Sequence, residues 1–262
     1  VPLVAPMLGA ELQKLGGWRA IFVFLLAYAV LLLGLMAGFL PKPAKTEKIG
    51  RDIFAVVAGR FKRVLQTRAA MGYLFFQAFS FSSMFVFLTE SSFVYMKLYG
   101  VSPRLYAWMF GLNIITMATF NRITAWRLKT GTHPQAILKW GIIVQLGANL
   151  LMAVSAAAFD LPPFWLLVGC VMFSVGTQGL VSANTQACFM GYFKEEGGSA
   201  NAVLGVCQSV IGASVGMLTT WLHNGTAQIM PLMMLASTVC GIILLRSCSH
   251  QAWKENSKAA GG

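Results

Sequence analysis

Residues 70–95 read AMGYLFFQAFSFSSMFVFLTESSFVY, and this stretch of sequence holds a single charged side chain, Glu90. A helix needs about 20 predominantly apolar residues to cross roughly 30 Å of hydrocarbon. The stretch is therefore long enough and apolar enough to predict one membrane-spanning helix.

Similar apolar stretches recur along the whole chain, separated by short connections that contain Gly or Pro. A half-length apolar stretch ends near Leu12. Full spans are then predicted at residues 21–40, 70–95, 104–125, 136–158, 164–188, 200–222 and 227–246. Apolar residues make up 57% of the chain and charged residues only 11%, which is too few charges to cover a water-exposed surface. We therefore expect an all-α integral membrane protein.

The basic residues predict the orientation. If the connections alternate between the two sides, four of the 20 Lys and Arg residues (Lys14, Arg19, Lys97 and Arg104) fall on one side and the remaining 16 on the other. Cytoplasmic connections carry an excess of Lys and Arg. We therefore expect the C-terminus in the cytoplasm. The predicted domains are the end of an N-terminal bundle (1–40), a basic cytoplasmic connector (41–68), a six-helix bundle (69–247) and a cytoplasmic tail (248–262).

The same composition disfavours several other classes of protein. The net charge of +12 arises in the connections and not along one soluble face, so no nucleic-acid partner is expected. The five cysteines lack paired spacing, and the three histidines lie apart and outside the spans. No metal site, cofactor or catalytic residue is expected, and a membrane-embedded enzyme is the least favoured alternative.

Several segments resemble one family. Residues 4–24 (VAPMLGAELQKLGGWRAIFVF) resemble the fifth-helix antiporter motif, and its exit into helix six, in drug:proton antiporters of the major facilitator superfamily. Residues 79–103 (FSFSSMFVFLTESSFVYMKLYGVSP) and 112–121 (LNIITMATFN) look like helices seven and eight of its Bcr/CflA group of multidrug exporters, with a weaker similarity at residues 182–205. The resemblance implies the major facilitator fold: a C-terminal six-helix bundle preceded by half of helix five and by helix six.

The resemblance also implies an activity. A Bcr/CflA protein would export small lipophilic drug-like compounds across the bacterial inner membrane in exchange for protons, as a monomer working by alternating access, and so confer antibiotic resistance. On that plan this chain is an N-terminally truncated fragment of a longer parent, inactive alone. The motif's second glycine is replaced by Ala10, and the family's coupling acid in helix one would lie in the missing part. A solute uniporter or importer of the same fold remains the alternative.

The resemblance assigns the antiporter motif to Pro2, Pro6 and Gly9, although Pro and Gly are also common in ordinary membrane helices. Helical periodicity gives residues 70–95 a mixed polar and aromatic stripe. Candidate cavity-lining residues on this stripe and on the other spans are Ser80, Ser83, Phe87, Glu90, Asn113, Gln178 and Gln208. Polar side chains can equally hold membrane helices together, which is the role expected for Gln145 and Asn149.

Glu90 is the only acidic residue within the predicted full spans. Intramembrane carboxylates are costly enough to be functional candidates. Glu90 is therefore the candidate for proton coupling, or else a structural residue near the external membrane boundary.

Overall fold

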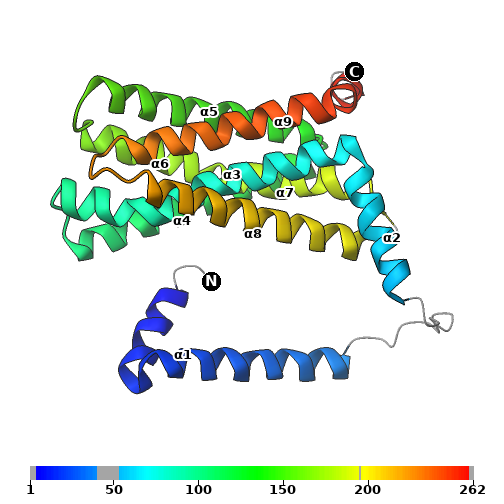
Figure 1. Ribbon diagram of the computed structural model, residues 1–262, viewed down its shortest axis with the longest axis horizontal. Helices are drawn as coiled ribbons and strands as arrows, with labels where there is room; N and C mark the ends of the chain where they lie inside the picture. Colours follow the sequence, from blue (N-terminus) through cyan, green and yellow to red (C-terminus); the bar gives the residue numbers. More distant parts are fainter. Residues whose placement is uncertain (1–3, 40–52, 195, 260–262) are drawn as a thin grey trace. The chain divides into compact units, whose positions relative to one another are not determined.

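The computed structural model describes residues 4–39, 53–194 and 196–259, and within these ranges the regular structure is entirely helical (Figure 1). The prediction of an all-α membrane fold is confirmed. The chain divides into two compact units, residues 1–54 and 55–262, which are described separately.

The first unit contains α1 (Val4–Phe39), which is two helical segments joined by a bend. Gly16 and Gly17 leave the helical conformation, and Gly17 has φ 66°, a left-handed value that glycine adopts without steric cost. The bend follows the predicted half-span. After it, Gly16–Phe39 is long and apolar enough to cross a membrane. Residues 40–52, which hold much of the predicted connector, lie outside the described residues.

The second unit contains the remaining helices. They are α2 (Ile53–Gln66), α3 (Arg68–Ser92), the π-helix η1 (Phe93–Leu98), α4 (Pro103–Lys129), α5 (Pro134–Ala158), α6 (Phe164–Gly176), α7 (Gln178–Met190), α8 (Gly197–Trp221) and α9 (Ile229–Ala259). Pro103 and Pro134 begin their helices, at positions where the missing N–H has no intrahelical partner to lose. α9 continues past Ser249, where the backbone is locally non-helical, into residues predicted to form the tail.

Five spans of this unit are long and apolar enough to cross a membrane: α3 with η1, α5, α6 with α7, α8 and α9. α4 occupies the predicted span 104–125 as a continuous 27-residue helix, but it is less apolar than these five. Its apolar run is interrupted by Asn113, Asn121 and Arg122. The predicted helix at this position is confirmed, and its crossing of the membrane remains a prediction.

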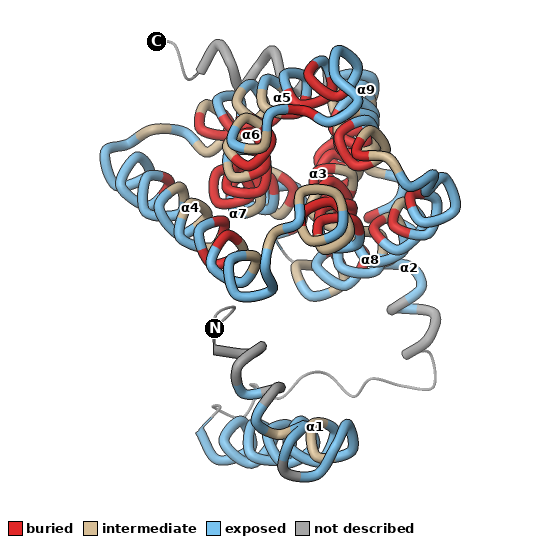
Figure 2. The backbone as a smooth tube through the Cα atoms, turned by 90° about the vertical axis from the view of Figure 1, so that its left-hand side faces the viewer, coloured by how far each residue is buried: buried red, intermediate tan, exposed pale blue. Residues whose placement is uncertain are grey.

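α3 lies at the centre of the packing, against α7, α8 and α9, while α5 packs on α6, α7 and α9 (Figure 2). Two apolar clusters fill the interior. Toward one end the cluster includes Tyr73, Leu74, Phe76, Val181, Phe189 and Leu245. Toward the other it includes Phe87, Tyr95, Leu167, Val171, Met230 and Met234. The buried residues of α3 therefore pass from one cluster to the other.

α6 and α7 run end to end and are separated by Thr177, whose hydroxyl donates to the Ser174 carbonyl oxygen (2.6 Å). α4 crosses closely here. A Cβ atom at Gly179 would lie 2.4 Å from the Met117 carbonyl oxygen of α4, so only glycine permits this approach.

α2, the α4–α5 link, the α7–α8 link and the end of α9 gather at one end of the second unit, on the right of Figure 1. Arg63 of α2 pairs with Glu196, just before α8, with 2.7 Å between Nη1 and Oε1. The described parts of the basic segments that the sequence assigns to one side thus lie at one end, and their cytoplasmic placement remains a prediction. We call this end the basic end.

Candidate functional site

Midway along α3, buried polar side chains join three helices. The Ser80 hydroxyl donates to Gln145 Oε1 on α5 (2.8 Å), and Gln178 Nε2 on α7 donates to both the hydroxyl and the carbonyl oxygen of Ser80 (2.9 Å each). All three residues are buried. The polar face of α3 is therefore hydrogen-bonded here to α5 and α7.

A second set of hydrogen bonds lies one turn further along. Asn149 Nδ2 on α5 donates to Thr238 Oγ1 (2.8 Å) and to the Met234 carbonyl oxygen (3.3 Å) on α9, and more weakly to Ser83 Oγ (3.4 Å). Gln145 and Asn149 therefore pack between helices, as predicted. We call the combined set the polar belt: Ser80, Ser83, Gln145, Asn149, Gln178 and Thr238.

The polar belt keeps unused hydrogen-bonding capacity. Gln145 Nε2, Asn149 Oδ1 and Gln178 Oε1 are buried and have no hydrogen-bond partner among the described residues. Interhelical hydrogen bonds in membranes are worth about 0.6 kcal/mol on average, so the belt positions its helices at modest gain. The cavity-lining role of Ser80, Ser83 and Gln178 remains a prediction.

The other cavity candidates lie apart from the belt. Asn113 is buried on α4, and Gln208 is half-buried on α8. Phe87 is buried and stacks on Phe110, with ring centroids 6.1 Å apart. Because α4 packs on α6 and α7 while α8 packs on α3, the structure places Asn113 and Gln208 on different flanks of the bundle (Figure 2).

Toward the end of the unit opposite the basic end, Glu90 meets a histidine that the sequence analysis did not connect to it. The Glu90 side chain is 6% exposed, and its Oε2 lies 2.8 Å from Nδ1 of His223, in the link between α8 and α9. The His223 side chain is 31% exposed, so the pair has a buried member and a partly solvated one. We call Glu90 and His223 the external pair, after the membrane side that the distribution of basic residues predicts for this end.

An aromatic ring packs against the histidine of the external pair, and a lysine lies near that ring. The Phe93 ring meets the His223 ring edge to face at 4.5 Å, and Lys97 Nζ lies 5.8 Å from the centroid of Phe93. Among the described residues, no other group hydrogen-bonds or ion-pairs with the Glu90 carboxylate. A carboxylate and an imidazole at this distance can share, accept or release a proton.

The backbone beside the external pair is irregular. η1 follows Glu90 after two residues, and π-helical turns inside α-helices are often found at functional sites. Nearby, the Ser91 and Tyr106 hydroxyls lie 2.9 Å apart, and Tyr99 donates to the Pro162 carbonyl oxygen. Burial raises the pKa of Tyr99, so its phenol stays protonated as a donor at neutral pH.

The residues of the predicted antiporter motif lie either in the first unit or outside the residues that the structure describes. Pro2 lies outside the described residues, whereas Pro6 and Gly9 lie in α1 before its bend. Their role remains a prediction. Among the described residues, no group of three or more His, Cys, Asp or Glu side chains could hold a metal ion.

His223 could have been proposed from sequence by one signal. It is the first titratable residue after the 200–222 span, at the membrane side to which alternation also assigns the end of 70–95. Two connections on the same side of the membrane can meet, which brings a histidine outside the spans to a carboxylate near the end of one.

Comparison with known proteins agrees with this architecture. A family model described as Major Facilitator Superfamily matches residues 1–217. A "Bicyclomycin resistance protein homolog" of Haemophilus influenzae is 29% identical over 247 residues, 92% of this chain and 60% of that protein. An "Uncharacterized MFS-type transporter YdgK" of Bacillus subtilis is 26% identical over 258 residues, 98% of this chain and 63% of that protein.

The chain thus spans about 60% of the length of these curated relatives. The predicted resemblance to the Bcr/CflA group is confirmed by the match to the bicyclomycin resistance homolog. With the family match over residues 1–217, it follows that this multi-pass membrane chain belongs to the Major Facilitator Superfamily.

Proposed function

We propose that the chain forms the C-terminal half, with the adjoining end of the N-terminal half, of a proton-coupled exporter of small lipophilic compounds. Transport proceeds by alternating access in the bacterial inner membrane, with the C-terminus in the cytoplasm. The name of the Haemophilus relative, which refers to bicyclomycin resistance, supports drug export as the activity. Membership of a transporter superfamily supports transport over an enzymatic role.

One observation carries the coupling proposal: the single carboxylate in an apolar span is buried and held by an imidazole at 2.8 Å. A buried carboxylate is costly unless it is paired or neutralised. Protonation of Glu90 removes that cost and releases His223, so a proton arriving from outside changes the contact between α3 and the α8–α9 link. We assign proton coupling to the external pair on this basis.

The substrate would contact polar side chains of this bundle that the neighbouring helices leave partly exposed. Of the cavity candidates, Gln208 is half-buried, whereas Phe87, Asn113, Gln178 and the two serines are buried among helices. We therefore assign direct substrate contact to Gln208 first. We assign to the polar belt the role of positioning α3, which carries Glu90 of the external pair.

The test is drug tolerance of an efflux-deficient bacterium that expresses the complete reading frame containing this chain. Wild-type protein should raise tolerance, and a protonophore should abolish the gain. Glu90→Gln keeps the size and one hydrogen bond but cannot carry the charge, so it should lose at least 90% of the protonophore-sensitive tolerance. Membrane abundance is measured for each variant.

Asp160→Asn is the matched control, because Asp160 is an exposed acid in the link between α5 and α6, at the same end as Glu90. It should export like wild type. If Glu90→Gln also exports normally, the external pair does not couple protons. If abundant wild-type protein gives no tolerance to any compound, a uniporter or importer becomes the better assignment.

A further inference from the structure

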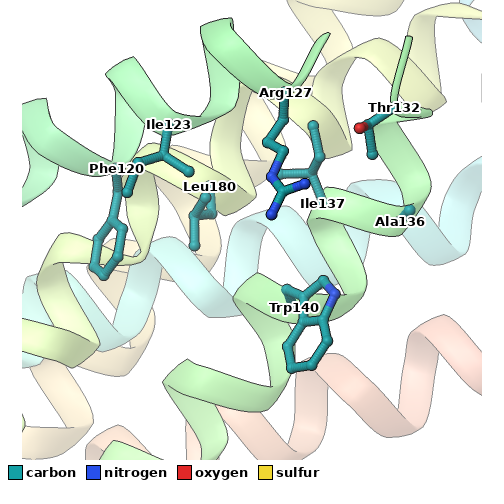
Figure 3. Close-up of a pocket in the computed structure, with 8 residues that line it drawn as sticks. All are labelled: Phe120, Ile123, Arg127, Thr132, Ala136, Ile137, Trp140 and Leu180. Atoms are coloured by element: carbon teal, nitrogen blue, oxygen red, sulfur yellow. The ribbon is translucent and has the colours of Figure 1, made fainter. Parts of the chain in front are cut away.

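A cleft between α4 and α5 plays no part in the proposed export mechanism. It encloses about 260 Å³ at the basic end, with α7 as its floor (Figure 3). Its wall consists mainly of Phe120 and Ile123 from α4, Ile137 and Trp140 from α5, and Leu180 from α7, with Arg127 at its mouth.

The cleft exists because α4 and α5 are each held against α7 and diverge from one another. On the α4 side, Thr124 donates to the Gly179 carbonyl oxygen (2.9 Å), and Gly179 allows the close crossing already described. On the α5 side, a Cβ at Gly141 would lie 2.9 Å from Val181 Cγ2. Two close contacts with the same helix leave a gap above Leu180 that no side chain fills.

The cleft runs from the membrane boundary inward. Arg127 lies two residues before the end of α4, and Phe120 lies seven residues deeper, which is about 10 Å along a helix. On α5, Trp140 lies six residues after Pro134, a similar depth of about 9 Å. The charged mouth is thus at headgroup level and the aromatic wall at the level of acyl chains.

Arg127 has no carboxylate partner in the described part of the chain, where none lies within 4.0 Å of its guanidinium. The guanidinium lies 5.1 Å from the centroid of the Trp126 ring. Figure 3 shows the side chain extending from α4 toward Ile137 and Trp140. An arginine without an internal counter-ion is suited to a phosphate, which it binds through charge-assisted hydrogen bonds.

We propose that this cleft binds an anionic phospholipid of the cytoplasmic leaflet. The lipid phosphate contacts Arg127, and one acyl chain lies along Phe120, Ile123 and Trp140. Basic pockets between membrane helices on the cytoplasmic side bind such headgroups. Trp140 is 67% exposed, so this wall faces the bilayer and a lipid enters laterally. The cleft volume of about 260 Å³ is smaller than the roughly 300–1,000 Å³ of pockets that hold a drug-sized ligand. The cleft therefore has no room for both acyl chains, and the second acyl chain of the lipid remains in the bilayer.

The test measures lipid binding to the complete protein, purified in detergent and delipidated, by native mass spectrometry. Phosphatidylglycerol should bind at least five times more tightly than phosphatidylcholine with the same chains. Arg127→Gln should weaken phosphatidylglycerol binding about fivefold, the contribution of one basic residue near an anionic lipid. Trp140→Ala should weaken long-chain phosphatidylglycerol more than a short-chain form, because it removes a wall contacted only by the acyl chain.

Lys129→Gln is the matched control, since Lys129 is exposed on α4 two residues from Arg127 and does not line the cleft. It should change binding less than twofold. If Arg127→Gln and Lys129→Gln weaken phosphatidylglycerol binding equally, general surface charge explains the binding and the proposed site is wrong. Equal binding of phosphatidylglycerol and phosphatidylcholine by the wild-type protein would also overturn the proposal. Glycerol phosphate that competes as well as the whole lipid would also overturn it, because the acyl chain would then contribute nothing. Unfolding midpoints without lipid establish that each variant is folded.

Discussion

The polar belt and the external pair both include residues of α3, Ser80 and Ser83 in the belt and Glu90 in the pair, but they are built from different chemistry. Hydroxyls and amides make the belt, and four of its members are completely buried: Ser80, Gln145, Asn149 and Thr238. A carboxylate and an imidazole make the external pair, seven residues or about 10 Å beyond Ser83, and the imidazole is partly solvated. The neutral groups of the belt hold their helices by hydrogen bonds alone, whereas the two groups of the pair can exchange a proton. α3 thus contributes both to a fixed anchor and to a contact suited to proton exchange.

The largest expected effect comes from overfilling the belt. Ser80→Leu adds a large side chain at a fully buried position and leaves Gln145 Oε1 without its donor. We expect a loss of about 2–3 kcal/mol in the unfolding free energy, measured by SDS titration of the complete protein in mixed micelles. Ser209→Leu, at an exposed position on α8, should change it by less than about 0.5 kcal/mol. Equal stability of the two variants would mean that the belt is not tightly packed.

A smaller effect is expected when an amide of the belt is replaced by an apolar residue of similar size. Asn149→Leu removes up to three interhelical hydrogen bonds but also removes an unpaired buried oxygen. We expect a loss of about 1 kcal/mol by the same titration, with the pH profile of export unchanged. A shifted pH profile would mean that the belt, like the external pair, takes part in proton coupling.

The smallest effect on stability is expected at the external pair. His223→Gln keeps a hydrogen-bond donor for the Glu90 carboxylate, so the unfolding free energy should fall by less than about 1 kcal/mol. Export should nevertheless respond less to external pH, because glutamine cannot exchange a proton with Glu90. Drug efflux from cells loaded at a series of external pH values measures this. An unchanged profile would assign the pH response to another group.

The sequence predicted the order and approximate limits of the helices because hydrophobic length and helix breakers are local properties. The bend at Gly16 and Gly17 and the helix starts at Pro103 and Pro134 all fall at predicted breaks. Glu90 was identified because a lone carboxylate stands out in an apolar stretch. These features need no knowledge of how helices meet.

The partners of the polar residues could not be predicted in the same way. Helical periodicity placed Ser80 and Ser83 on one side of a helix, but it could not tell whether that side meets a cavity or the amides of Gln145 and Asn149. His223 is 133 positions from Glu90, and their contact depends on how two separate connections pack. The π-helical turn η1 likewise has no local pattern that distinguishes it from an α-helix.

The division of one span at Thr177 has a consequence for how the chain enters the membrane. α6 and α7 have 13 residues each, or about 20 Å of helix, and neither alone covers the roughly 30 Å of hydrocarbon. The two segments must therefore partition into the bilayer together. During synthesis, the α5–α6 link can be committed to its side of the membrane only after α7 has also been made.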